Sequence, residues 1–258
     1  MILTNENYYT DIMNQKYMSV SQYKQFCKCE AAAMAELTGE YHRPMTTALL
    51  VGSYVDAWFE GTLLDFKGDH PEIFKRDGSL KADFIQAEEI IDRVLQDKLF
   101  MRYMGGKKQV IRTAELFGAQ WKIKIDSLHK DKIVDLKVMR TMERIMGKSF
   151  VEYWGYDLQM AIYAAVEGHD LSTYLAVVTK ETPADLELIS IPKWRREELL
   201  EEVAKRMPHI LDVKSGKVKP ERCGTCEYCR ATKKLTEPID FELVGLSAAE
   251  RKAVFGYA

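Results

Sequence analysis

Two short strand-like runs that each carry an aspartate constrain this sequence more than any other feature. The first run, residues 122–126, alternates lysine and isoleucine and ends at Asp126. Nine residues later, Asp135 and Lys137 flank Leu136 in an otherwise apolar run. Side chains alternate across a strand, so Asp135 and Lys137 share a face, with Cα atoms about 6.5–7 Å apart. Two acids and an amine that meet at one sheet edge can hold a divalent cation beside a water molecule that needs activation.

Simpler explanations exist for each half of this pattern taken alone. Asp126 could be a turn residue at the end of a strand, and Asp135 and Lys137 could form a surface pair. The joint pattern favours a site, because the run around Asp135 is apolar enough to be a central strand. Burying an acid and a lysine there is costly unless they pair or coordinate a ligand.

The composition limits the classes of protein that this chain can represent. The chain has 258 residues, 47% of them hydrophobic, which is enough for a substantial core. The formal net charge is −2, so binding to DNA would need a locally basic groove; the clusters of Lys and Arg could line one, or could be solvated faces. We see neither a secretory signal peptide nor an apolar run of about 18 residues, so we expect a cytoplasmic protein without a membrane partner.

The hydrophobic periodicity predicts an α/β chain in which helices surround a group of short strands. The first three strands are expected to form a meander, and residues 65–81 a loop. We expect a single domain over 1–258, with a central mixed β-sheet flanked by helices. Its sections are a helical part at 19–104, a core at 109–213, a cysteine cluster at 220–235 and a peripheral tail at 236–258. The expected helices span 19–38, 46–64, 82–104, 151–167 and 194–213, and the expected strands span 109–117, 119–129, 132–138, 172–179 and 185–191.

Further polar residues near the two acidic strands could join the same site. Gln159 and Tyr163 are four residues apart on a predicted helix, so they project from one face. Glu115, on the strand before Asp126, could supply another carboxylate. The alternatives are a surface glutamine, a tyrosine at the rim of the core and a solvent-facing glutamate.

The five cysteines form two groups that indicate a metal site. Cys223, Cys226 and Cys229 follow a Cys-x₂-Cys-x₂-Cys pattern, which is common around [4Fe–4S] clusters. A Cys₄ zinc site would use the same residues. Cys27 or Cys29 could provide the fourth thiol. The third possibility is a loop of reduced cysteines without a metal.

Together these motifs resemble the PD-(D/E)xK nuclease superfamily, in its RecB-like branch. Within that branch, the chain is most similar to the phage RecE-type (exonuclease VIII-like) exonucleases, over residues 19 to about 235. The resemblance implies a restriction-endonuclease-like core with a mixed sheet between helices. It rests on the order and spacing of Asp126, Asp135-x-Lys137 and Gln159-x-x-x-Tyr163.

The resemblance also implies a role for each of these residues. Asp126, Asp135 and the carbonyl group of Leu136 would bind the catalytic Mg²⁺ or Mn²⁺. Lys137 would orient or activate the attacking water and stabilise charge on the phosphate. The motif of Gln159 and Tyr163 would contact the network around the active site or the DNA.

Two positions depart from the pattern of the family. Many relatives carry Gly-x-x-x-His, whose histidine binds metal; the matching segment here begins at Gly52 and ends at Asp56. Either Asp56 or Glu115 could complete the metal site. The cluster-bearing relatives have one cysteine before the core, which matches Cys29, and three after it. Their usual downstream spacing is Cys-x₂-Cys-x₅-Cys, so zinc remains an alternative to an iron–sulfur cluster.

The resemblance implies a metal-dependent DNA exonuclease that degrades the ends of linear duplex DNA. Its setting would be phage-type recombination with a RecT-like single-strand annealing partner, and a ring-shaped homo-oligomer would be expected. Two alternatives are a Cas4-like nuclease that prefers single strands and a catalytically silent DNA-binding module with the same fold.

Overall fold

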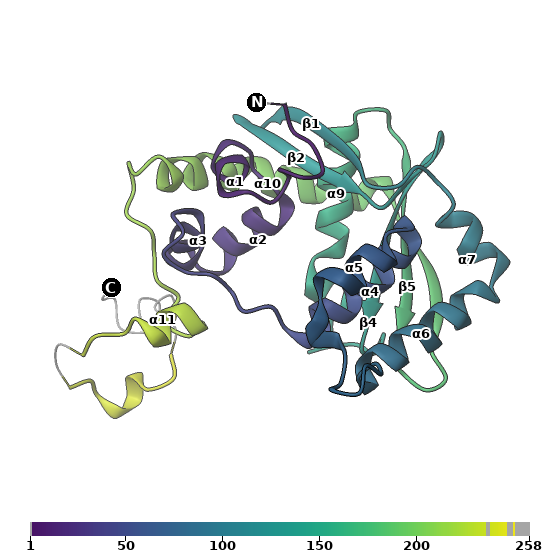
Figure 1. Ribbon diagram of the computed structural model, residues 1–258. Helices are drawn as coiled ribbons and strands as arrows, with labels where there is room; N and C mark the ends of the chain where they lie inside the picture. Colours follow the sequence, from purple (N-terminus) through teal and green to yellow (C-terminus); the bar gives the residue numbers. More distant parts are fainter. Residues whose placement is uncertain (1, 236–237, 247–249, 251–258) are drawn as a thin grey trace. The chain divides into compact units, whose positions relative to one another are not determined.

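The computed structural model describes residues 2–235, 238–246 and 250, and the chain divides into two compact units (Figure 1). The first unit comprises Met1–Arg43, Glu115–Trp121 and Val203–Ala258. The second comprises Pro44–Ala114 and Lys122–Glu202. Each unit therefore combines segments that are distant in the sequence.

A four-stranded mixed sheet forms the centre of the second unit. Its order is β3 (Ser127–Leu128), β4 (Lys132–Met139), β5 (Ser172–Thr179) and β6 (Leu186–Ile191). β4 and β5 run parallel, whereas β3 and β6 are antiparallel to their neighbours. Parallel strands need a crossover, and α8 (Phe150–Trp154) and α9 (Tyr156–Glu167) lie between β4 and β5 in the chain. The predicted α/β fold with a central mixed sheet is confirmed.

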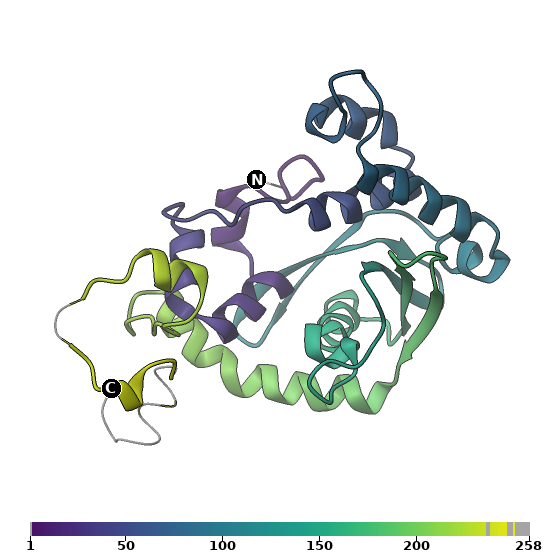
Figure 2. The ribbon, with the colours of Figure 1, turned by 90° about the horizontal axis from the view of Figure 1, so that it is seen from below.

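The two faces of β4 have different surroundings, as the alternation of its residues predicts. Val134 and Leu136 are buried in a core that includes Ala176 and Val178 of β5 and apolar residues of α4 (Thr47–Glu60) and α6 (Ala82–Leu95). Asp135 points to the other face, where Gln159 of α9 contacts it. Helices thus cover both faces of this sheet (Figure 1, Figure 2).

The predicted three-stranded meander is wrong, because the second strand is interrupted at Asp126. β1 (Val110–Leu116) and β2 (Ala119–Ile125) form a separate two-stranded sheet. Pairing with β4 begins only at β3, immediately after Asp126. Asp126 Oδ2 accepts a hydrogen bond from the Leu136 N–H at 2.9 Å, so a side chain takes the place of a backbone acceptor there.

Helices of the second unit are shorter than predicted. The segment predicted as one helix over 82–104 contains α6 and α7 (Lys98–Tyr103), and the Asp97 side chain caps α7 by accepting from two backbone N–H groups. The helix predicted over 151–167 is divided at Gly155, whose φ of 62° is left-handed. The loop predicted over 65–81 begins inside α5 (Leu63–Asp69) and includes a 3₁₀ turn, Pro71–Ile73.

The first unit contains α1 (Asp11–Lys16), α2 (Val20–Lys28), α3 (Glu30–Leu37), α11 (Glu227–Ala231) and the second half of α10 (Lys193–Lys214). Cys29 has an extended backbone, with φ −164° and ψ 105°, so it ends α2 and begins α3. The single helix predicted over 19–38 is therefore two helices that meet at this cysteine.

The C-terminal tail predicted over 236–258 falls partly outside the described residues. Within it, the structure describes a 3₁₀ turn, Phe241–Leu243. Across residues 2–235, 238–246 and 250, no helix is both long and apolar enough to cross a membrane.

Candidate metal centre

The sheet of the second unit brings Asp126 and Asp135 together. β3 and β4 pair Ser127 with Val134 and Leu128 with Ile133, a register that places Asp126 opposite Asp135. Asp135 is buried, with 2% of its surface exposed, and Asp126 is half-buried. The carboxylates thus lie on adjacent strand positions, as the opening motif predicts.

Two side chains hold the buried Asp135 carboxylate. Gln159 donates a hydrogen bond from Nε2 to Asp135 Oδ1 at 2.7 Å. The Lys137 ammonium forms an ion pair with Oδ2. Lys137 Nζ also lies 5.0 Å from the centre of the Tyr156 ring. A buried charge is stabilised by such partners, so Asp135 is fixed in one orientation.

Burial and repulsion between neighbouring acids raise the pKa values of Asp126 and Asp56. Burial and the charges of Asp135 and Asp56 raise the pKa of Asp126 well above its ordinary value, against the opposing effects of Lys137 and the Leu136 N–H. The half-buried Asp56, on α4, has its pKa raised to about 7 by burial, Asp135 and Glu60, while Lys137 and Lys124 act in the opposite direction. A cation bound among these oxygens would relieve this repulsion.

Lys137 stays protonated in this environment. Burial alone would lower its pKa, but the charges of Asp135 and Asp126 outweigh that effect and raise it above the ordinary value. The ammonium group is therefore a permanent positive charge beside the carboxylates.

Three residues near the site were not predicted from the sequence: Glu60, Lys108 and Tyr156. Glu60 lies one helical turn after Asp56 on α4; burial raises its pKa, and the charges of Lys124 and Lys108 oppose that rise. Burial lowers the pKa of Lys108, against the charges of Asp126, Glu60 and Asp56. The four-residue spacing from Asp56 to Glu60, and the three-residue spacing from Tyr156 to Gln159, were the available signals.

The other two residues predicted for the site are Tyr163 and Glu115. Tyr163 is half-buried on α9, one turn after Gln159. Glu115 is exposed and belongs to the first unit, where its carboxylate accepts a hydrogen bond from Gln120 at 3.1 Å. Their roles in the site stay predictions.

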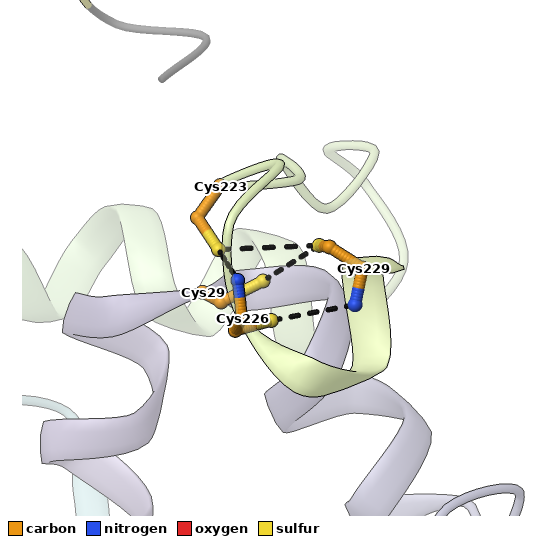
Figure 3. Close-up of side chains that lie close together, drawn as sticks. All are labelled: Cys29, Cys223, Cys226 and Cys229. Atoms are coloured by element: carbon orange, nitrogen blue, oxygen red, sulfur yellow. Dashed lines mark hydrogen bonds between the residues drawn. The ribbon is translucent and has the colours of Figure 1, made fainter. Parts of the chain in front are cut away.

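A second candidate site, built from sulfur, lies in the first unit (Figure 3). The Sγ atoms of Cys29, Cys223, Cys226 and Cys229 all lie within 4.8 Å of one another, so these residues could hold a metal ion. Cys27 is exposed and is not in this group, so Cys29 is the upstream member.

The four thiols differ in their protonation. Burial raises the pKa of Cys29 and, together with the neighbouring thiols, raises that of Cys226 to about 12. Burial acts in the same direction at Cys223, but hydrogen bonds from the backbone and side chains of Cys226 and Thr225 outweigh it and lower the pKa to about 6. The cluster therefore contains one thiol that ionises near neutral pH.

The family was identified from the sequence as a whole. Residues 19–232 match the family described as "PDDEXK-like domain of unknown function (DUF3799)". The chain belongs to this PDDEXK-like family. The match includes both candidate sites, and it confirms the superfamily to which the motifs pointed.

A solved structure supports the same assignment. The chain is similar to a protein described as "Putative exonuclease" from Eubacterium rectale, with 47% sequence identity and a TM-score of 0.91 over 95% of this chain and 99% of that chain. The structure of SSO0001 shares 13% identity over 81% of this chain and 90% of that chain, with a TM-score of 0.30 that supports no inference. No curated protein sequence matches the chain significantly.

The raised pKa of Asp56 predicts a pH-dependent stability for this PDDEXK-like protein in EDTA. Asp56 ionises at about pH 4 in the unfolded chain and at about 7 in the folded one. Its contribution to stability is therefore complete below about pH 4 and is lost as the pH rises through 7. We therefore expect the melting temperature of the wild type, relative to that of Asp56→Asn, to decrease as the pH rises from about 4 to 7. A difference that stays constant with pH would contradict this.

Proposed function

We propose that the chain is a divalent-metal-dependent DNA exonuclease that hydrolyses phosphodiester bonds at the ends of linear duplex DNA. The observation that carries this proposal is the ion pair between the buried Asp135 and the half-buried Lys137, beside Asp126, in a chain of the PDDEXK-like family. The similarity to a protein described as a "Putative exonuclease" supports the choice of exonuclease.

The donor set of the acidic site fits a hard divalent cation. Asp126, Asp135, the Leu136 carbonyl and Asp56 would offer oxygen atoms, which Mg²⁺ and Mn²⁺ prefer. Burial and neighbouring acids raise the pKa values of Asp126 and Asp56, and a bound cation would offset the repulsion among these carboxylates. When bound, such a cation lowers the pKa of water and neutralises charge that develops on a phosphate.

The protein groups supply position and charge. Lys137 keeps its proton and would donate it in a hydrogen bond to a phosphate oxygen or to the attacking water. Tyr156 and Asp135 hold the lysine in place. Gln159 orients the Asp135 carboxylate so that its oxygen atoms keep a fixed direction, and it acts as a positioning residue. In place of the family's histidine, Asp56 would complete the metal site.

The biological setting follows from the family resemblance. We propose that the enzyme acts in phage-type recombination and leaves a single strand for a RecT-like annealing partner. A ring-shaped homo-oligomer would keep the enzyme on its DNA. The Cas4-like single-strand nuclease and the silent DNA-binding module are the alternatives that the following experiments distinguish.

Degradation should depend on DNA ends. We expect Mg²⁺-dependent loss of a plasmid linearised by one cut, while the same plasmid in its closed circular form stays intact. End-labelled duplex and single-stranded oligonucleotides of one sequence test strand preference on a gel. Equal cleavage of the circular form would contradict an exonuclease, and a preference for single strands would favour the Cas4-like alternative.

Asp135→Asn and Lys137→Ala should each abolish this activity. Asn keeps the shape of Asp135 but removes a metal-binding charge, and Ala removes the cationic donor. We expect kcat to fall by at least about a hundred-fold in each variant. Asp131→Asn is the matched control, because Asp131 lies in the loop before β4 with its side chain 73% exposed.

Thermal unfolding should show that these variants stay folded. Activity close to that of the wild type in either folded variant would remove the proposed role of the pair. A wild type that binds DNA but never cleaves it would favour the silent module.

A further inference from the structure

The four-cysteine group has the dimensions of a site for a single ion. Cys29 Sγ lies 3.6 Å from Cys229 Sγ, and Cys223 Sγ lies 3.9 Å from the same atom. Four sulfur atoms placed tetrahedrally around Zn²⁺, with Zn–S bonds of about 2.3 Å, lie about 3.8 Å apart. These two sulfur–sulfur distances therefore match the spacing around one tetrahedral zinc ion.

A [4Fe–4S] cluster does not fit these distances. Each of its four ligand sulfurs lies beyond a different corner of a cube of iron and sulfide, which separates the ligand sulfurs by about 6 Å. Here all four Sγ atoms lie within 4.8 Å of one another (Figure 3). The space between the thiols is thus too small for the cluster that the family resemblance implies.

The backbone around the thiols is arranged to stabilise thiolates. The Cys226 N–H donates to Cys223 Sγ at 3.3 Å, and the Cys229 N–H donates to Cys226 Sγ at 3.4 Å. The left-handed φ of +78° at Gly224 lets the chain turn between these cysteines. Hydrogen bonds of this kind orient metal ligands and reduce the charge on them.

The segment that carries the three downstream cysteines has little apolar surface to hold it. The buried cluster here consists of Cys29, Ala31, Ala32 and Cys229, with Tyr228 packed against it. Its other links to the helices include hydrogen bonds from the Ala31 N–H to the Glu221 carbonyl and from the Glu221 N–H to Glu30. A small segment of this kind is commonly stabilised by a structural metal ion.

We infer that Cys29, Cys223, Cys226 and Cys229 bind one Zn²⁺ in a closed tetrahedral site. The ion would connect the junction of α2 and α3 to α11 and to the loop before it. With all four positions occupied by protein thiolates, the site leaves no place for water or substrate, so its role is structural. This inference is independent of the proposed nuclease activity.

Metal analysis of the full chain tests the inference. After purification without oxygen from cells supplied with both iron and zinc, we expect colourless protein with one zinc per chain and no acid-labile sulfide. Replacing the zinc with Co²⁺ should give the visible absorption bands of tetrahedral cobalt with thiolate ligands. Brown protein that contains iron, or metal-free protein with five reactive thiols, would overturn the inference.

Two cysteine variants locate the ion. Cys226→Ser should lose the zinc and the cobalt spectrum and should melt at a lower temperature, whereas Cys27→Ser should match the wild type, since Cys27 is exposed outside the group. Zinc retained by Cys226→Ser would place the ion elsewhere and contradict the inference.

A titration of the wild type covers the case in which Cys226→Ser does not fold. A mercurial reagent should release one zinc per chain as it modifies the cluster thiols. Complete modification of the thiols without zinc release would also contradict the inference.

Discussion

The ion pair between the buried Asp135 and the half-buried Lys137 is the interaction on which the rest of the proposed site depends. Both residues lie on one face of β4, and the side chains that alternate with them fill the core under α4 and α6. A buried pair of this kind seldom adds net stability, because removing two charges from water costs about as much as their attraction returns. Its position beside Asp126 and Asp56 gives it a chemical reason to exist, since burial and neighbouring acids raise the pKa values of those two residues and a bound cation would offset the repulsion.

The two candidate sites offer different ligand atoms and therefore suit different kinds of metal ion. The second unit offers carboxylate oxygens, which suit a hard ion that must also accept water and phosphate. The first unit offers four thiols, which suit a softer ion such as Zn²⁺ whose four coordination positions are all filled by the protein. Each site is assembled from segments far apart in the chain: Asp56 with Asp135 in one, and Cys29 with Cys223 in the other.

Much of this arrangement could be predicted from the sequence, because strand alternation is a strictly local rule. This rule predicted that Asp135 and Lys137 lie on one face and Leu136 on the other. The four-residue helical spacing predicted that Gln159 belongs to the site. The alternation rule could not show that β2 would end just before Asp126, where the side chain takes the place of a backbone acceptor. It also could not show that Cys29 would be extended, because alanine-rich sequence on its C-terminal side favours an unbroken helix. Glu60 could not be predicted as a neighbour of the site because its charged partners come from other elements of the fold.

Anomalous diffraction from crystals soaked in Mn²⁺ tests the central claim most directly. We predict a manganese peak beside the carboxylate oxygens of Asp126 and Asp135, within reach of Asp56, that is lost in Asp135→Asn. A structure with Mn²⁺ bound elsewhere and none at these carboxylates would contradict it, and the Asp135–Lys137 pair would then be a structural feature of the sheet.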